Sequence, residues 1–333
     1  MGAALPTLRK YQLNGIASRL EKAYALPEEA EEEAPVSFQK ESLSSPAAIR
    51  DFLAKSEGKP CALHAAPTHL TVACDGTVYE IELAYDMLSL GMTMEEAWQA
   101  LLPLLQRKLY VHDGKHLWHA LRQMGLPLPA YQWDTMLGAY LINPQEKSYA
   151  LNHFAADDAG GVLSLAMQQK KQLADRGMLD LMENLEMPLM DVLFAMETEG
   201  FQVDGDVLLS LGKEFTEQTE SLKQQVYALT GVTGFNLNST QQLGKVLFET
   251  LGLPAGRKTK SGYSTDAETL ENLLDKHPCI APILKYRQVV KLNSTYIDAL
   301  IRKTDASGRV HSSFDQTGTA TGRISSSEPN LQN

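Results

Sequence analysis

Residues 61–83 have the sequence CALHAAPTHLTVACDGTVYEIEL, in which apolar residues form three short runs. The runs cover Cys61–Ala65, His69–Cys74 and Thr77–Leu83, a length typical of β-strands. Asp75-Gly76 separates the last two runs, and an Asp-Gly pair in that place is a strong signal for a tight hairpin turn. The stretch therefore predicts three strands, the last two joined as a hairpin.

Helical patterns flank these strands on both sides. The expected helices cover residues 46–58, Met94–Gln106 and Lys115–Met124, and another begins near Asp134, which can cap it. A further strand is expected at residues 108–112, KLYVH. Strands that alternate with helices predict an α/β domain over about residues 40–165.

The second half of the sequence is helical. Apolar residues within 206–230 recur at spacings of 3, 4, 7, 4 and 3, which predicts an amphipathic helix that ends at Gly231. Thr265-Asp-Ala-Glu268 has the spacing of a capping box and predicts a helix that runs to Lys276. GRVHSSF, residues 308–314, predicts a strand. Other helices are expected at residues 179–199, 240–251 and 280–303.

The composition is that of an ordinary globular protein, with 44% hydrophobic and 21% charged residues. It excludes a wholly disordered chain, a collagen and a small disulfide-stapled protein. No apolar run reaches the ~18 residues of a membrane helix, and the first residues lack the apolar core of a signal peptide. Three cysteines without a CxxC pair indicate a reducing compartment, so we expect a cytoplasmic protein without membrane association.

Charge is unevenly distributed along the chain. The net charge of −11 by itself argues against a nucleic-acid partner. Residues 257–333, however, contain eleven Lys and Arg against eight Asp and Glu, a net charge of +3, so the remainder carries −14. This asymmetry makes the C-terminal part the better guide to a polyanionic partner.

Two segments of this basic part can contact nucleic acid. Residues 257–264, RKTKSGYS, offer cations, hydroxyls and backbone N–H groups to phosphates, and Arg287, Lys291 and Thr295 share one face of the next long helix. Residues 315–333 are rich in amides and hydroxyls, which can contact acceptors in a minor groove. A solvated loop, a solvated helix face and a polar surface loop are the alternatives, and composition alone leaves both readings open.

The last sixteen residues, GTATGRISSSEPNLQN, closely resemble the T-x-T-G-R-[LI]-S-S-x-x-P-N-L-Q-N segment of family A DNA polymerases, the bacterial DNA polymerase I group. Other segments resemble the thumb of that family, or the helix that leads into it, in the same order. They are LEMPL (185–189), AMETEGFQVD (195–204), FNLNSTQQLGKVLFETLGLP (235–254), KTKSGYST (258–265) and YRQVVKLNSTYIDAL (286–300). The resemblance covers about residues 180–333.

The resemblance implies three groups of DNA contacts. The tip of the family's thumb contacts the duplex backbone, the following helix grips the primer strand, and the last segment lies at the minor groove and near the active site. The matching residues are, in that order, Lys258, Thr259 and Lys260; Arg287, Lys291, Ser294 and Thr295; and Thr321, Arg323, Ser325, Asn330, Gln332 and Asn333.

By its position, the first half should be the family's 3′–5′ exonuclease domain, which has a ribonuclease H-like α/β fold. That activity uses four carboxylates around two metal ions. The matching positions here carry Leu63-His64-Ala65-Ala66 and Leu117, which leaves Asp158 as the one remaining acid. We therefore expect an inactive domain without a metal site, and a residual 3′–5′ exonuclease is the alternative.

The expected organisation follows from these matches: a residual helix and acidic linker (1–37), a degenerate exonuclease-like domain (38–178), a thumb with its leading helix (179–308) and the start of a palm (309–333). In this family the carboxylates for the two Mg²⁺ ions follow the PNLQN segment. We therefore expect a monomer that binds primer–template duplex DNA but lacks a catalytic residue and cannot extend a primer. The parent polymerase would bind dNTPs and act in replication and repair. The alternative is a non-catalytic DNA-binding module that ends naturally at Asn333.

His112, His116 and His119 have spacings of 4 and 3, which could align three zinc ligands on one helix. Asp113-Gly114 favours a break after the first of them. We therefore interpret the three histidines as a chance cluster.

Overall fold

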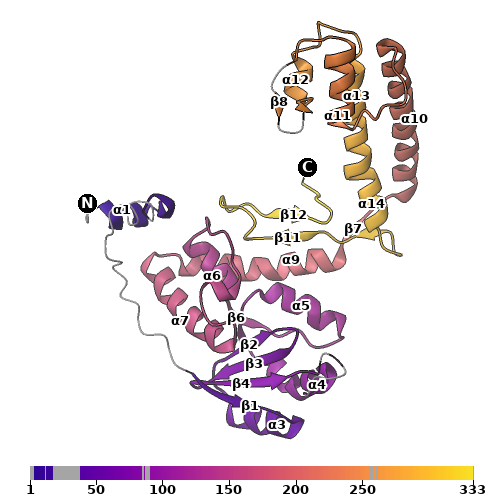
Figure 1. Cartoon of the computed structure of the whole chain (residues 1–333). Coiled ribbons are helices and arrows are strands. Elements are labelled where there is room, and N and C mark those ends of the chain that lie inside the picture. The colour runs from indigo at the N-terminus through magenta and orange to yellow at the C-terminus, as the bar shows by residue number, and fades with distance from the viewer. Residues whose placement is uncertain are drawn as a thin grey trace. The chain divides into compact units, whose positions relative to one another are not determined.

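The structure, a computed structural model, describes residues 4–11, 13–17, 38–84, 86, 91–255, 258–259 and 262–332. The chain divides into two compact units, each made of two separate stretches of sequence (Figure 1). The first, the α/β unit, comprises Met1–Met196 and Phe314–Ser325. The second, the helical unit, comprises Glu197–Ser313 and Ser326–Asn333.

Within the described residues, the α/β unit contains a six-stranded sheet in the order β1-β4-β3-β2-β5-β6. Its strands are β1 (Gln39–Ser42), β2 (Cys61–Ala65), β3 (His69–Cys74), β4 (Thr77–Glu82), β5 (Leu109–Val111) and β6 (Tyr131–Asp134). β2, β3 and β4 pair antiparallel, whereas β5 pairs in parallel with β2 and β6, and β1 pairs in parallel with β4. The predicted hairpin is confirmed, because Asp75 and Gly76 both have positive φ between β3 and β4.

Helices cover both faces of this sheet. They are α3 (Pro46–Lys55), α4 (Met94–Leu105), α5 (Gly114–Gln123), α6 (Thr135–Ile142) and α7 (Ala159–Asp175). Leu63 of β2 lies in one buried cluster with Leu101 of α4, and its neighbour Ala62 lies in another with Leu137 of α6. Successive side chains of a strand point to opposite faces, so the two clusters form two layers of core. The predicted α/β fold is confirmed.

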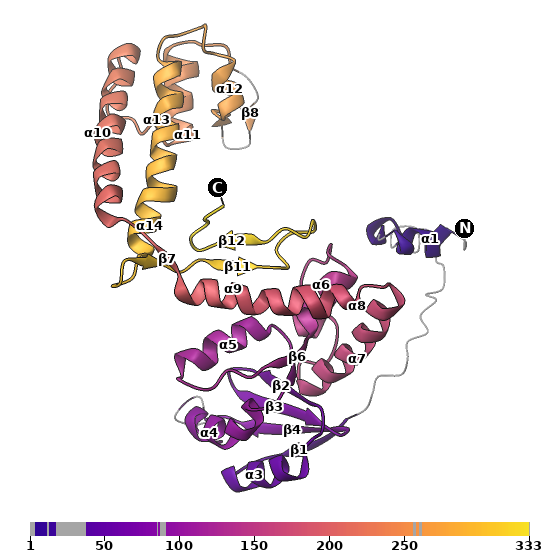
Figure 2. The same ribbon diagram turned by 180° about the vertical axis from the view of Figure 1, so that it is seen from behind.

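A long helix follows, formed by α8 (Leu179–Leu181), the π-helical turn η2 (Met182–Glu186) and α9 (Met187–Glu199) (Figure 2). It matches the helix expected at 179–199 and ends at Gly200, which has a φ of 69°. A positive φ suits glycine, because a Cβ there would strain the backbone.

The helical unit has one buried core, which includes Val226, Leu247 and Ile283. Its elements are β7 (Phe201–Gln202), α10 (Gly205–Thr230), α11 (Thr240–Gly244), η3 (Lys245–Thr250), β8 (Lys258–Thr259), β9 (Gly262–Tyr263), α12 (Ala267–Glu271), α13 (Ile280–Leu292), η4 (Asn293–Ile297), α14 (Asp298–Lys303) and β10 (Arg309–Val310). The long helix α10 packs along α13 and η4. It ends before Gly231, as predicted.

Three details of the predicted secondary structure are wrong. The helix expected to run to Lys276 is shorter, since α12 ends at Glu271. The capping box expected at Thr265 does not form, because Asp266 caps α12 by accepting a hydrogen bond from the N–H of Thr269. The strand expected at 308–314 is divided into β10 and β11 (Ser313–Asp315). The last strand is β12 (Ser325–Ser327).

The N-terminal segment is described only in part. Helix α1 covers Ala4–Lys10, within the residual helix expected from the sequence. The acidic linker lies outside the described residues. Among the helices that the structure describes, none is long and apolar enough to cross a membrane.

Candidate nucleic-acid interface

The basic segment after residue 257 contains a short β-hairpin rather than an irregular loop. Lys258 pairs with Tyr263 and Thr259 pairs with Gly262 across β8 and β9. Lys260, one of the predicted backbone contacts, lies outside the described residues. Lys258 and Thr259 therefore form strand β8, which lies between η3 and α12 along the chain.

The base of this hairpin is fixed by packing and hydrogen bonds. The ring of Tyr263 contacts that of Phe248, with 5.0 Å between centroids. Arg287 of α13 donates from Nη1 to the carbonyl of the buried Thr265 and from Nη2 to its Oγ1, the latter over 2.9 Å. Burial lowers the pKa of the Arg287 guanidinium. Arg287, which the sequence predicts to contact DNA, is therefore hydrogen-bonded to Thr265 in this structure.

The other predicted contacts of this region lie on the exposed surface of α13 and η4. Lys291, Ser294 and Thr295 are exposed. They are three and four residues apart, a spacing that places side chains on one helix face. The Ser294 hydroxyl donates to the carbonyl of Val290 over 2.9 Å. One ammonium and two hydroxyl groups thus lie on this exposed part of the helix, and the Ser294 hydroxyl already donates within it.

The segment before β12 presents Thr321 and Arg323 on the surface, with Ser325 half-buried. Thr319 Oγ1 donates to the carbonyl of Arg323 over 2.7 Å, which closes a turn around Gly322. Gly322 has a φ of 76°, a conformation that favours glycine. The backbone therefore turns sharply immediately before the arginine.

Hydrogen bonds also order the residues after β12. Ser326 Oγ accepts from the N–H of Leu331 over 3.1 Å, and Asn330 Oδ1 accepts from the N–H of Gln332 over 2.8 Å. Asn330 and Gln332 are exposed, and Asn333 lies outside the described residues. Two of the three residues predicted to make amide contacts are therefore exposed on the helical unit.

The C-terminal part of the chain is similar to a known protein family. Residues 205–333 match the family described as DNA polymerase family A. Residues 205–333 are therefore similar to DNA polymerase family A. This stretch contains every predicted DNA contact named above.

Similarity to known proteins covers more of the chain than residues 205–333. DNA polymerase I of Bacillus subtilis (strain 168) is 38% identical over 262 residues, which cover 68% of this chain and 30% of the relative. DNA polymerase I of Mycobacterium tuberculosis (strain H37Rv) is 32% identical over 333 residues, which cover 87% of this chain and 37% of the relative. The chain thus spans about a third of the length of these curated relatives.

A solved structure has a similar fold. It is the POL domain of Pol1 from M. smegmatis in complex with DNA primer-template and dNTP. It is 31% identical, with a TM-score of 0.70, and the match covers 88% of this chain and 56% of that chain. The mixed sheet with its helices, followed by the family A segment, is therefore similar to a polymerase domain.

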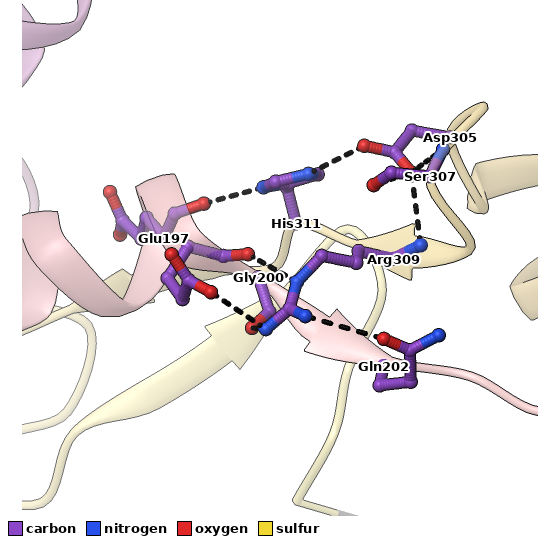
Figure 3. A network of polar contacts seen from close by, with 8 residues as sticks. Glu197, Gly200, Gln202, Asp305, Ser307, Arg309 and His311 are labelled. Atoms are coloured by element: carbon purple, nitrogen blue, oxygen red, sulfur yellow. Dashed lines mark hydrogen bonds and ion pairs between the residues drawn. The ribbon is translucent and has the colours of Figure 1, made fainter.

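A polar network that the sequence did not predict lies where α9 meets β7 in this polymerase-like chain (Figure 3). Arg309 Nε donates to the carbonyl of Glu199 over 2.7 Å, and its Nη2 lies 3.0 Å from the Glu199 carboxylate. His311 Nδ1 donates to the carbonyl of Glu197 over 2.8 Å, and its Nε2 lies 3.1 Å from Asp305 Oδ2. Glu199 and Glu197 are 110 and 114 residues from Arg309 and His311 in sequence, so local patterns do not reveal these two contacts.

Both ring nitrogens of His311 therefore face acceptors, an arrangement that only the protonated imidazole satisfies fully. The hydrogen bond to Glu197 and then the one to Asp305 raise the pKa of His311 above its ordinary value of 6.5. A raised pKa contributes stability that is fully present below the unfolded pKa and is lost as pH rises through the folded pKa.

The Asp305→Asn variant tests this network. We expect the pKa of His311 to fall toward its ordinary value, because the variant replaces a carboxylate with a neutral amide. NMR titration of the His311 ring measures this pKa directly, and urea unfolding at pH 6 and pH 8 measures its contribution to stability. Asp275→Asn, which removes an exposed carboxylate elsewhere in the helical unit, is the matched control. Equal titration of His311 in wild type and Asp305→Asn would contradict this account.

The positions matched to exonuclease carboxylates do not form an acidic site. Leu63 and Leu117 are buried. Asp158 caps α7 by accepting from the N–H of Gly161 over 2.9 Å and lies 3.0 Å from Lys40 Nζ. Burial opposes its ionisation, but the Gly161 N–H and the Lys40 ammonium together lower the pKa of Asp158. The Asp158 carboxylate therefore binds the N-terminus of α7 and the ammonium group of Lys40.

No metal centre is evident in the part of the chain that the structure describes, where no three His, Cys, Asp or Glu side chains gather so as to hold an ion. The three predicted cluster histidines are divided as expected, since Asp113 has a φ of 53° and α5 begins after it. His112 Nδ1 instead lies 2.8 Å from Thr135 Oγ1. The described residues thus do not fit the two Mg²⁺ ions of polymerase chemistry.

Proposed function

We propose that this chain is the duplex-holding part of a DNA-directed DNA polymerase and that its helical unit is the thumb. The observation that carries the proposal is the match of residues 205–333 to the family, because this stretch includes the exposed Lys291, Ser294 and Thr295. Hydroxyls and one ammonium on a single face contact a phosphate backbone without reading its bases. The hairpin at Lys258–Tyr263 would supply further backbone contacts.

We assign the minor groove to the exposed Arg323, Asn330 and Gln332. Minor-groove edges present mainly acceptors, which guanidinium and amide groups can contact at every base pair. Such contacts suit an enzyme that must hold any sequence. Thr321, Ser325 and Asn333 complete the proposed set.

We propose that residues 38–178 form a degenerate 3′–5′ exonuclease-like domain with a ribonuclease H-like fold. The sheet supports this assignment, since antiparallel β4-β3-β2 continue into parallel β5 and β6. The buried Leu63 and Leu117 support the loss of its chemistry. This domain would then act as a brace.

For the whole protein we propose template-directed addition of dNTPs to a primer 3′-hydroxyl, in replication and repair, by a cytoplasmic monomer. Two Mg²⁺ ions would supply the Lewis-acid chemistry of that reaction. Because the described residues do not fit those ions, no step of nucleotide transfer is assigned to them.

Duplex affinity of the Lys291→Ala variant tests the thumb assignment. Fluorescence anisotropy of a labelled primer–template at several salt concentrations measures both affinity and its salt dependence. We expect affinity to fall severalfold and the slope of log K against log salt to decrease by about 1, the value for one lost phosphate contact. Wild-type affinity should fall as salt rises.

Lys285→Ala is the matched control, because Lys285 is exposed on the same helix but lies on a different face. It should leave both affinity and slope unchanged. Equal behaviour of the two variants, or affinity independent of salt, would count against the proposal. The labelled DNA should remain intact with Mg²⁺ present, and shortening from its 3′ end would favour the residual exonuclease.

A further inference from the structure

We propose that Tyr140 of the α/β unit is a positioning residue for Arg323: its hydroxyl fixes the turn that presents this arginine. The inference rests on the proposed function, in which Arg323 contacts DNA. By positioning Arg323, the α/β unit would contribute to DNA binding without any nuclease activity.

The side chain of Tyr140 is itself firmly held. It projects from α6, is 4% exposed, and lies in the same buried cluster as Trp133 and Leu137. Its ring meets that of Tyr149 edge to face, with 5.8 Å between centroids. A buried ring in such a cluster has one accessible rotamer, so the position of its hydroxyl is set by the core of the α/β unit.

The hydroxyl of Tyr140 bridges two backbone groups of the turn. It donates to the carbonyl of Thr319 over 2.8 Å and accepts from the N–H of Gly322 over 3.1 Å. Together with the bond from Thr319 Oγ1 to the carbonyl of Arg323, it closes the turn from both ends. The backbone of Arg323 is thereby fixed, while its side chain remains exposed.

Two further contacts tie the stem of this turn to the same unit. Lys115 Nζ donates to the carbonyl of Phe314. Gln316 Nε2 donates to the carbonyl and carboxylate of Glu186, over 3.1 Å and 2.7 Å. The segment from Phe314 to Ser325 accordingly belongs to the α/β unit, although it follows the helical unit in sequence. Of these contacts, that of Tyr140 lies nearest to Arg323 along the chain.

The Tyr140→Phe variant removes the bridging hydroxyl and keeps the buried ring. Without DNA, we expect the amide of Gly322 to exchange its hydrogen roughly two- to tenfold faster, the range set by the loss of one hydrogen bond. Exchange measured by mass spectrometry on the full 333-residue chain reports this directly. We expect duplex affinity to fall severalfold, since ordering Arg323 is then left to the DNA-binding step.

Tyr149→Phe is the matched control, because it removes a tyrosine hydroxyl that donates to the carbonyl of Asn143 over 2.9 Å. It should change neither the exchange of Gly322 nor the affinity. The double variant Tyr140→Phe/Arg323→Ala tests whether Tyr140 acts through the arginine. We expect it to bind DNA as weakly as Arg323→Ala alone, because residues that act as one unit are not additive.

The outcomes separate this inference from the function on which it rests. Unchanged Gly322 exchange in Tyr140→Phe overturns the positioning role, as does an equal loss of affinity with and without Arg323. Unchanged affinity in Arg323→Ala overturns the proposed DNA contact of that residue, and with it the proposed purpose of the turn. Faster exchange together with non-additive loss of affinity supports both.

Discussion

Replacement of Asp134 by alanine is expected to lower the free energy of unfolding of the α/β unit by about 3–5 kcal/mol, which is a large part of the stability of an ordinary domain. The Asp134 side chain is completely buried. It accepts hydrogen bonds from the N–H groups of Asp113, Gly114 and Met136, over 3.2, 2.6 and 2.8 Å. Alanine would leave these three donors in the core without an acceptor.

The carboxylate of Asp134 connects two helix N-termini, since it caps α6 and also binds the first residue of α5. An ordinary cap serves one helix and contributes about 1 kcal/mol. Urea unfolding followed by tryptophan fluorescence reports on the α/β unit, because Trp98, Trp118 and Trp133 all lie in it.

Asp134→Asn is the matched control for this prediction. It keeps one oxygen acceptor of similar size, so it should lose less stability than Asp134→Ala. An exposed cap in the helical unit, Asp266, gives the second comparison, and its change to alanine should leave the tryptophan transition in place. A loss of only about 1 kcal/mol in Asp134→Ala would contradict the double role.

Arg287→Ala is expected to weaken duplex binding about tenfold, more than Lys291→Ala. The guanidinium holds both the carbonyl and the hydroxyl of Thr265, at the base of the Lys258–Tyr263 hairpin. Its loss leaves buried polar atoms of Thr265 without a partner and frees the hairpin that carries the proposed backbone contacts. Several contacts are then weakened through one substitution.

Arg287→Lys decides between this explanation and a direct contact with phosphate. Lysine keeps the charge but cannot reproduce the forked geometry of a guanidinium. If Arg287 acts by holding Thr265, the lysine variant binds DNA almost as weakly as the alanine variant. Affinity close to wild type in Arg287→Lys would instead favour a direct phosphate contact. Anisotropy with the same primer–template measures all three proteins.

The sequence predicted the elements that depend on nearby residues. Asp75-Gly76 predicted the β3–β4 hairpin, because a two-residue turn with positive φ needs no distant partner. The apolar spacing in 206–230 predicted α10, and Asp134 predicted the start of α6. In each case the signal and the structure it specifies lie within a few residues of one another.

Features that depend on distant partners were not predictable in this way. Thr265 has capping-box spacing, but its hydroxyl binds Arg287, and Asp266 takes the cap. The π-helical turns η2, η3 and η4 interrupt helices that periodicity presents as continuous. Arg309 and His311 bind carbonyls of Glu199 and Glu197, more than a hundred residues earlier.

The candidate site was predicted from resemblance rather than from spacing. Composition alone left both a solvated basic loop and a DNA contact open, and the similarity to the family covers residues 205–333. The structure then divides the predicted contacts by environment. Lys291 and Arg323 are exposed, whereas Arg287 is engaged with Thr265. The difference between Arg287 and Lys291 could not be predicted from the sequence, because both residues lie in the same segment, residues 286–300.

The division of each unit into two stretches of sequence affects the order of events during synthesis. The segment Phe314–Ser325 leaves the ribosome only after all of residues 197–313. At ordinary translation rates that delay is on the order of ten seconds, long compared with the folding of a small domain. The earlier part of the α/β unit must therefore remain soluble with its docking surface for this segment uncovered, until the nascent chain returns to complete it.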